Sequence, residues 1–188
     1  MTNLDAPRGL VPTGHLSGGT PNRLNEYSIA SAYGTNIFTG QLVERTGTGS
    51  NIAVSGVTNA DNLGVFAGVR YVDANGHPVW ARYWTASTVG TDIVALVYDD
   101  PDTIFTIQND GTYTAAMEGN VADTAGTGGN TATGLTTQEL GTASVATSGS
   151  GQLKILGLTK RVDNEVGLNA DVNVIINEHI NRATSAAV

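Results

Sequence analysis

The sequence predicts an all-β fold, either a β-sandwich or a small, β-tulip-like barrel. Short runs of alternating apolar and polar residues recur from residue 27 onward, and Asn-Gly and Asp-Gly turns separate several of them. Apolar stripes with the 3.6-residue period of a helix are almost absent. We therefore expect seven or more strands and less than about a sixth of the chain in helices.

The length and composition fit a single globular domain. The chain has 188 residues, of which 40% are hydrophobic and 14% are charged, whereas charged residues usually make up about 25% of a soluble protein. So low a charge density argues against a charge-driven disordered chain, and the composition is not that of a coiled coil. The absence of cysteine excludes disulfides and thiolate metal sites.

The expected strands follow one another with short turns between them. They lie at residues 36–44, 51–55, 64–72, 78–84, 93–98, 103–108, 152–158 and 171–177. Gly40 and Gly68 interrupt two of these runs, which indicates a break or a bulge. Asn75-Gly76 predicts a tight turn, so residues 65–84 should form a hairpin.

Residues 1–26 have a different composition from the β-domain that we assign to residues 27–188. Pro7, Pro12 and Pro21 disfavour regular structure, which predicts an irregular N-terminal arm. The arm is either a loose terminus or a segment that becomes ordered on a partner, and its scattered apolar and basic residues favour the second alternative. The candidate partner-binding residues of the arm are Leu4, Arg8, Leu10, Val11, Leu16, Arg23 and Leu24.

A second unusual stretch is the Gly-, Thr- and Ala-rich segment 118–151. It is too long for a simple loop in a compact domain, so we expect an inserted excursion on the surface. The capping-box spacing from Thr136 to Glu139 predicts a short helical turn there.

The charges are unevenly distributed. Nine basic and 17 acidic residues give a net charge of −8, which argues against general binding of nucleic acid or of an anionic membrane. No signal peptide or membrane-spanning run is visible, so we expect a soluble protein made in the cytoplasm. Between Arg82 and Lys154 there is no basic residue, and this window can be a solvated acidic face or a surface for a basic partner.

No motif in the sequence indicates catalysis, and we expect no enzyme activity, cofactor or required metal. His15, His77 and His179 are scattered, and no nucleophile or phosphate-binding motif is present. The cluster Asp99, Asp100 and Asp102 could bind Ca²⁺, but its spacing does not fit an EF-hand. Turn formation is the simpler explanation of these carboxylates.

Trp80, Arg82 and Trp84 would share one face of a strand, because side chains alternate along strands. Two exposed tryptophans beside an arginine could stack on sugars or anchor a protein interface. Alternatively, both rings lie in the core.

Several stretches resemble the capsid decoration, or cement, proteins of tailed bacteriophages. They include an acidic Asp-Pro-Asp turn before a β-run, a Gly-Asn-Thr linker and a terminal Ile-Asn-Glu-His. The resembling stretches are residues 98–108, 129–140, 153–158, 163–170 and 174–179. The likeness covers about residues 60–180 and implies a family whose chain ends on a surface strand.

The resemblance implies a structural virion protein that binds the outer surface of a capsid and cements neighbouring major capsid protein subunits. It further implies a symmetric homo-oligomer, with a trimer favoured, and location in the virion after synthesis in the host cytoplasm. The alternative is a carbohydrate-binding or host-attachment module of a virion. No catalytic, metal-binding or cofactor-binding residue follows from the likeness.

Overall fold

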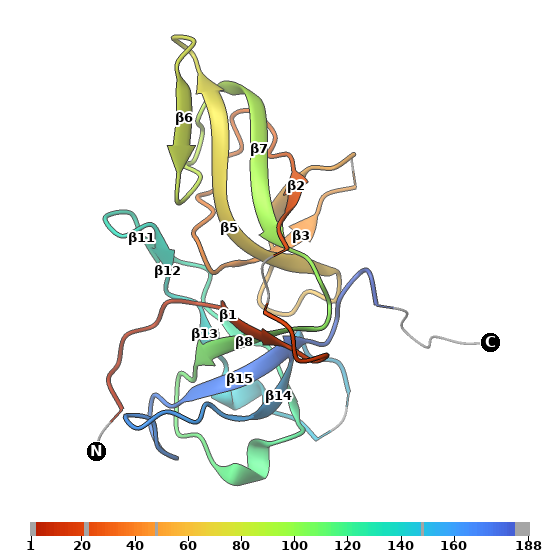
Figure 1. The fold of residues 1–188 in the computed structure, drawn as a ribbon, viewed down its shortest axis with the longest axis vertical. Coiled ribbons are helices and arrows are strands. Elements are labelled where there is room, and N and C mark those ends of the chain that lie inside the picture. Colours follow the sequence, from red (N-terminus) through yellow and green to blue (C-terminus); the bar gives the residue numbers. More distant parts are fainter. Residues whose placement is uncertain (1–2, 21–22, 48, 148, 183–188) are drawn as a thin grey trace, which may run out of the picture.

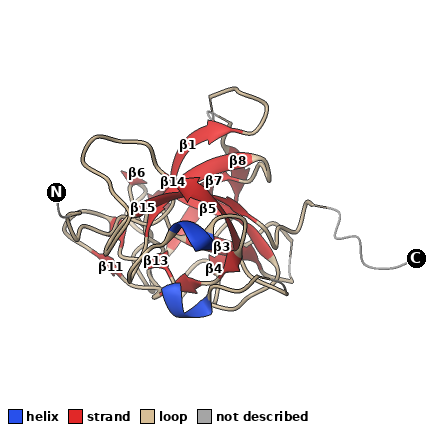
Figure 2. Ribbon diagram, turned by 90° about the horizontal axis from the view of Figure 1, so that it is seen from below, coloured by secondary structure: helices blue, strands red, loops and turns tan. Residues whose placement is uncertain are grey.

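The computed structural model describes residues 3–20, 23–47, 49–147 and 149–182, and it confirms the all-β prediction. Only 3% of the residues are helical, in two single 3-10 turns at Ala115–Met117 (η1) and Thr142–Ser144 (η2) (Figure 2). No helix in the described part of the chain is long and apolar enough to cross a membrane.

Most of the strands build two antiparallel sheets (Figure 1). Sheet A has the order β1 (Val11–His15), β8 (Thr103–Gln108), β15 (Asp171–Ile176), β14 (Leu153–Leu158) and β9 (Val121–Ala122). Sheet B has the order β2 (Asn25–Tyr27), β7 (Gly90–Tyr98), β5 (Asn62–Asp73), β3 (Leu42–Arg45) and β4 (Ile52–Val54), and β6 (Pro78–Ala81) also pairs with β5. The described strands do not close a barrel, so the architecture is that of a sandwich.

Two further ribbons of two strands each lie beside the sheets. One pairs β10 (Thr124–Ala125) with β13 (Glu139–Leu140), and the other pairs β11 (Gly129–Asn130) with β12 (Leu135–Thr136). The predicted helical turn at Thr136 is therefore wrong, because that residue ends a strand of the second ribbon.

The hairpin predicted around Asn75 is confirmed. β5 and β6 pair antiparallel, and Gly76 has a φ of +81°, which glycine adopts without strain. β6 ends at Ala81, three residues earlier than predicted. The break predicted at Gly40 is also present. Gly40 has a φ of +86°, and strand β3 begins two residues after it.

Strands β3 and β5 of sheet B separate two hydrophobic cores. Alternate residues of β3 face opposite sides: Leu42 packs in the core between the two sheets, and Val43 packs in the second core. β5 behaves similarly, with Val65 in the first core and Phe66 in the second. The inner face of sheet A closes the first core, while the segment around Ile37 and Trp84 covers the second.

The N-terminal segment differs from the irregular arm that its prolines predict. Val11–His15 forms β1 and pairs with β8, and Pro12 is accommodated because β1 is an edge strand of sheet A. Asn25–Tyr27 forms β2 and pairs with β7 in sheet B. Leu10 is buried in the core between the sheets. Pro21 lies outside the described residues.

A close backbone crossing fixes this segment against the rest of the fold. The Leu10 amide donates to the Gly40 carbonyl at 2.8 Å. A Cβ on Gly9, whose φ is +71°, would lie 2.1 Å from Thr136 Cγ2 and 2.4 Å from the Gly40 oxygen. Only glycine fits this crossing, so the N-terminal segment is an integral part of the sandwich.

The Gly- and Thr-rich segment is also built into the fold, because buried glutamine side chains hold it. Gln138 accepts a hydrogen bond from the Leu42 amide at 2.9 Å and donates to Thr124 Oγ1 at 3.2 Å. Gln152 accepts from the Thr124 amide and hydroxyl and donates to Asn62 Oδ1. Gln138, Gln152 and Asn62 are fully buried. We call this set the amide network, and its bonds satisfy polar groups that burial would otherwise destabilise.

The last long strand lies inside its sheet. β15 pairs with β8 on one side and with β14 on the other, and Val174, Ile175 and Ile176 are buried. The expectation of a terminal surface strand is therefore wrong for 174–176. Residues 183–188 lie outside the described part of the chain.

Candidate functional site

Exposed apolar side chains occur in two segments that meet near the end marked N in Figure 1, the N-terminal segment and the loop between β14 and β15. The Asn3 side chain ties the two together, since it donates to the carbonyls of Glu165 and Leu168 and accepts from the Glu165 amide. Next to these contacts, Leu4 is 80% exposed, Val166 54% and Leu168 55%. Val162 of the same loop is 97% exposed. We call these four side chains the N-terminal surface.

Hydrogen bonds from β8 hold the N-terminal segment in place below this surface. Gln108, at the end of β8, donates to the Leu4 carbonyl at 2.8 Å and accepts from the Ala6 amide at 2.9 Å. The same side chain donates to the Asn169 carbonyl at 3.1 Å. One buried glutamine thus positions both components of the N-terminal surface.

Ion pairs stabilise the base of the surface. Asp171, almost fully buried, lies 2.8 Å from Arg161 Nη1 and 3.5 Å from Arg8 Nη2. Hydrogen bonding to Asp163 raises the pKa of Arg161, and the same contact lowers the pKa of the Asp163 carboxyl. Both arginines therefore have partners within the chain, and their half-exposed side chains lie next to the apolar residues.

The other predicted residues of the arm do not join this surface. Leu10 is buried, so it is not available to a partner, and Val11 is half-buried in β1. Leu16, Arg23 and Leu24 are exposed, but they follow β1 along the chain. Arg23 lines a cavity with Asp100 instead. Of the seven arm residues predicted, only Leu4 and Arg8 belong to the N-terminal surface or its base.

The predicted face of Trp80, Arg82 and Trp84 does not exist. The strand ends at Ala81, Trp80 is 71% exposed and Trp84 is fully buried. Trp84 packs edge-on against Tyr71 in the second core and donates to the Tyr33 carbonyl. The core alternative is therefore correct for Trp84 and wrong for Trp80.

Trp80 has a cation as its neighbour. The Arg70 guanidinium lies 5.8 Å from the centre of the Trp80 ring, and the two residues are cross-strand partners. Arg70 also pairs with Glu26 at 3.0 Å. A single exposed aromatic ring remains from the predicted platform.

The acidic turn after β7 is held by bonds within the chain. Asp99 is buried and accepts from Asn25 Nδ2 and from the Tyr27 hydroxyl at 2.7 Å. Burial raises the pKa of Tyr27 to about 12, so this hydroxyl stays protonated. Asp99 thus joins β2 to the end of β7 and is not free to bind a cation.

Asp100, Asp102 and His15 bring three possible metal-ligand atoms within 4.8 Å of one another, but their hydrogen bonds do not suit a metal. The Ser17 amide donates to His15 Nδ1 at 3.1 Å, which places the proton of the neutral ring on Nε2. That nitrogen lies 3.3 Å from Asp100 Oδ2, while Arg182 pairs with Asp102 at 3.0 Å. The turn is therefore held together by its own partners.

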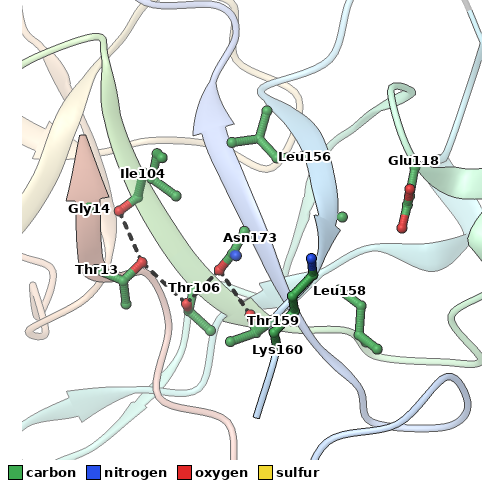
Figure 3. Close-up of a pocket in the computed structure, with 11 residues that line it drawn as sticks. Thr13, Gly14, Ile104, Thr106, Glu118, Leu156, Leu158, Thr159, Lys160 and Asn173 are labelled. Atoms are coloured by element: carbon green, nitrogen blue, oxygen red, sulfur yellow. Dashed lines mark hydrogen bonds between the residues drawn. The ribbon is translucent and has the colours of Figure 1, made fainter. Parts of the chain in front are cut away.

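A second surface feature is an open groove of about 690 Å³ on the outer face of sheet A. Figure 3 shows a row of polar side chains along it. Thr106 and Thr159 both donate to Asn173 Oδ1, at 3.0 and 2.9 Å. Leu156, Glu118 and Lys160 also line the groove, and all three are exposed.

Neither surface is marked by a pattern in the sequence. Val162, Val166 and Leu168 lie in a loop between two strands, and no periodic pattern marks them. Asn3 and Gln108 are ordinary polar residues in the sequence, and their role depends on contacts over 61 to 165 positions. The one signal in the sequence was Val162, an apolar residue between the charged Arg161 and Asp163.

A scan against protein-family models, a search of curated proteins and a search of solved structures each found no match. The likeness to capsid decoration proteins therefore stays a prediction from the sequence.

Proposed function

We propose that this protein is a structural component of a virion that binds the outer surface of a phage capsid and holds neighbouring major capsid subunits together. The observation that carries the proposal is the N-terminal surface, where Leu4, Val162, Val166 and Leu168 are more than half exposed on a firmly held base. Apolar side chains grouped in this way favour a protein partner. The sequence resemblance supports a capsid as that partner.

The construction of the surface suits docking to a rigid shell. Asn3 and Gln108 fix its two segments before any partner arrives, so little conformational entropy is lost on binding. Covering apolar side chains contributes about 25 cal/mol per Å² of area removed from water. Many such contacts on one shell would act together, as multivalent binding does.

The test is co-sedimentation of the purified protein with capsid shells of the phage that encodes it. We expect Leu4→Ser combined with Leu168→Ser to weaken binding about tenfold or more, because apolar contact area is lost. The matched control is Val89→Ser, since Val89 is 60% exposed at the far end of sheet B. Equal binding by all three proteins would show that the N-terminal surface is not the contact.

A carbohydrate-binding or host-attachment module is the second candidate, and the exposed Trp80 ring is what favours it. A single ring beside Arg70 offers a smaller stacking surface than the three-residue platform that the sequence predicts. A glycan array probed with the protein and with Trp80→Ala distinguishes this candidate. Binding that depends on Trp80 would support it, and an array without signal would remove it.

A further inference from the structure

We propose that residues 178–182 form a segment that opens locally when the His179 ring takes up a proton. The proposal concerns the isolated protein and does not depend on the proposed binding to a capsid. Of the buried side-chain nitrogens and oxygens in the described part of the chain, His179 Nε2 is the one without a hydrogen-bond partner. Native proteins satisfy nearly all such groups, so this exception calls for an explanation.

A few backbone bonds hold the 178–182 segment against sheet B. The backbone amide and the side-chain nitrogen of Asn62, the first residue of β5, both donate to the Glu178 carbonyl, at 3.2 and 3.0 Å. The Ile180 amide donates to the Asn62 carbonyl at 2.9 Å, and Ile180 packs against the second core. The segment follows β15, so it connects the end of sheet A to the start of β5 through contacts that can break without unfolding either sheet.

The hydrogen bonds of the His179 ring fit only its neutral form. The residue is 2% exposed, and the Asn181 amide donates to Nδ1 at 3.0 Å. Because Nδ1 accepts this bond, the proton of the neutral ring lies on Nε2. A second proton would have to bind at Nδ1, where its N–H would point at the N–H of Asn181. The buried ring therefore cannot become charged without losing this bond, and opening of the segment places the ring in water.

The charged groups near the ring do not offset its burial. Asp99 and Asp100, in the turn after β7, favour a charged ring, while Arg182, which pairs with Asp102 at 3.0 Å, disfavours it. The Asp99 carboxylate already accepts hydrogen bonds from two side chains of β2. Burial is the strongest influence, and it lowers the pKa of His179 below its usual 6.5. The cation is therefore excluded from the closed segment.

Protonation acts on the equilibrium between the closed and the open segment. In the open segment the ring lies in water, where histidine titrates near 6.5, and in the closed segment it titrates lower. Opening is therefore favoured as the pH falls through about 6.5. For a ring that stays neutral in the closed segment, the equilibrium constant for opening rises about 25-fold between about pH 7 and about pH 5.

Hydrogen exchange of single amides, followed by NMR on the full-length protein at these two pH values, tests the proposal. The Ile180 amide reports on the segment, because its bond to Asn62 breaks on opening. Val174, which pairs with neighbours on both sides within sheet A, reports on unfolding of the whole domain. We expect the protection factor of Ile180 to be about tenfold or more below that of Val174, and to fall by about 10- to 25-fold on acidification.

His179→Gln removes the titrating ring and keeps a side chain that can accept the Asn181 amide. Its Ile180 protection should change less than about threefold between the two pH values. Burial raises the pKa of Glu178 in the same segment, but that carboxyl titrates in both proteins. A fall in His179→Gln as large as that in the wild type would overturn the proposal.

Asp102→Asn is the matched variant, because it removes the ion pair of Arg182 and leaves the His179 ring unchanged. It should lower Ile180 protection at both pH values and keep the dependence on pH that the wild type shows. Equal protection of Ile180 and Val174 in the wild type would mean that the segment opens only when the domain unfolds, and the proposal would be wrong. Wild-type Ile180 protection that does not change with pH would contradict it as well.

Discussion

The N-terminal segment and the Gly- and Thr-rich segment both lack regular patterns in the sequence, yet the fold orders them by different means. Residues 3–16 gain a strand pairing with β8, a buried leucine and an ion pair between Arg8 and Asp171. Residues 118–151 form only two-residue strands and depend on the amide network instead. Backbone pairing holds the first segment, and buried side-chain amides hold the second.

The two segments also differ in where their apolar side chains lie. The Gly- and Thr-rich segment buries Leu140 completely, while the N-terminal segment leaves Leu4 and Leu16 more than half exposed. A segment that buries its apolar residues stabilises the fold. A segment that leaves them exposed on an ordered backbone keeps apolar area available to a protein partner. This contrast is why the proposed capsid contact includes the N-terminal segment.

Leu10→Ala should produce the largest loss of stability, because it opens a cavity between the two sheets. We expect the free energy of unfolding to fall by about 4 kcal/mol, in the range for a fully buried leucine. Leu16→Ala, at an exposed position of the same segment, should change it by less than about 0.5 kcal/mol. Denaturant titration measures both. Similar small losses would mean that residues 3–16 are only loosely attached.

Gly9→Ala tests the place where the two segments touch. The new methyl group would overlap Thr136 and the Gly40 carbonyl, and we expect a loss of about 3 kcal/mol from overpacking and backbone strain. Gly18→Ala separates the two causes, because Gly18 also has a positive φ but has open space around it. The crossing matters less than we argue if thermal melts show equal losses for both variants.

Gln138→Leu should loosen the Gly- and Thr-rich segment without loosening β1. The Leu42 amide loses its acceptor inside the protein, and we expect the free energy of unfolding to fall by about 2 kcal/mol. Amide hydrogen exchange should rise around 124–128 and remain unchanged in β1. Thr137→Val, at the exposed neighbouring position, is the control. Faster exchange in β1 as well would show that the two segments are held as one unit.

His179, which lies outside both segments, should be the clearest source of acid sensitivity near neutral pH. The Asn181 amide donates to His179 Nδ1, and Nε2 is buried without a hydrogen-bond partner among the described residues. Burial therefore lowers the pKa of His179 below its usual 6.5. As the pH falls through about 6.5, the unfolded chain binds a proton that the folded state excludes, so stability falls by up to about 1.4 kcal/mol per pH unit.

The comparison with His179→Gln isolates this contribution. Burial raises the pKa values of Glu44 and Glu178, so these carboxyls add stability as the pH falls, but they do so in both proteins. The wild type should therefore lose stability relative to the variant between about pH 7 and about pH 5. Parallel curves would show that His179 does not titrate differently in the folded and unfolded states.

The strands that the sequence predicted correctly are those whose pattern is local. The run of β-branched and aromatic residues at 103–108 and the turn at Asn75-Gly76 are local signals, and both predictions are confirmed. The pairing of Val11–His15 has no such signal, because its partner lies about 90 residues away in β8. Pro12 also pointed away from a strand, and only its place at an edge of the sheet makes it tolerable.

The surfaces were harder to predict than the strands. Trp80 and Trp84 look equivalent in the sequence, and the end of β6 at Ala81 is what separates an exposed ring from a buried one. The N-terminal surface requires residues 3–4 to meet residues 162–168, and the contact depends on single side chains such as Asn3. Neither the amino-acid composition nor the periodicity of apolar residues predicts such long-range side-chain contacts.

Cryo-electron microscopy of particles of the phage that we propose encodes this chain decides whether the domain lies on the outside of a shell. We expect density for the two-sheet domain on the outer face of the shell, with Leu4, Val166 and Leu168 against major capsid subunits. Particles without this chain on their outer surface would contradict the proposed function. A bound domain whose N-terminal surface faces solvent would contradict the proposed mode of binding.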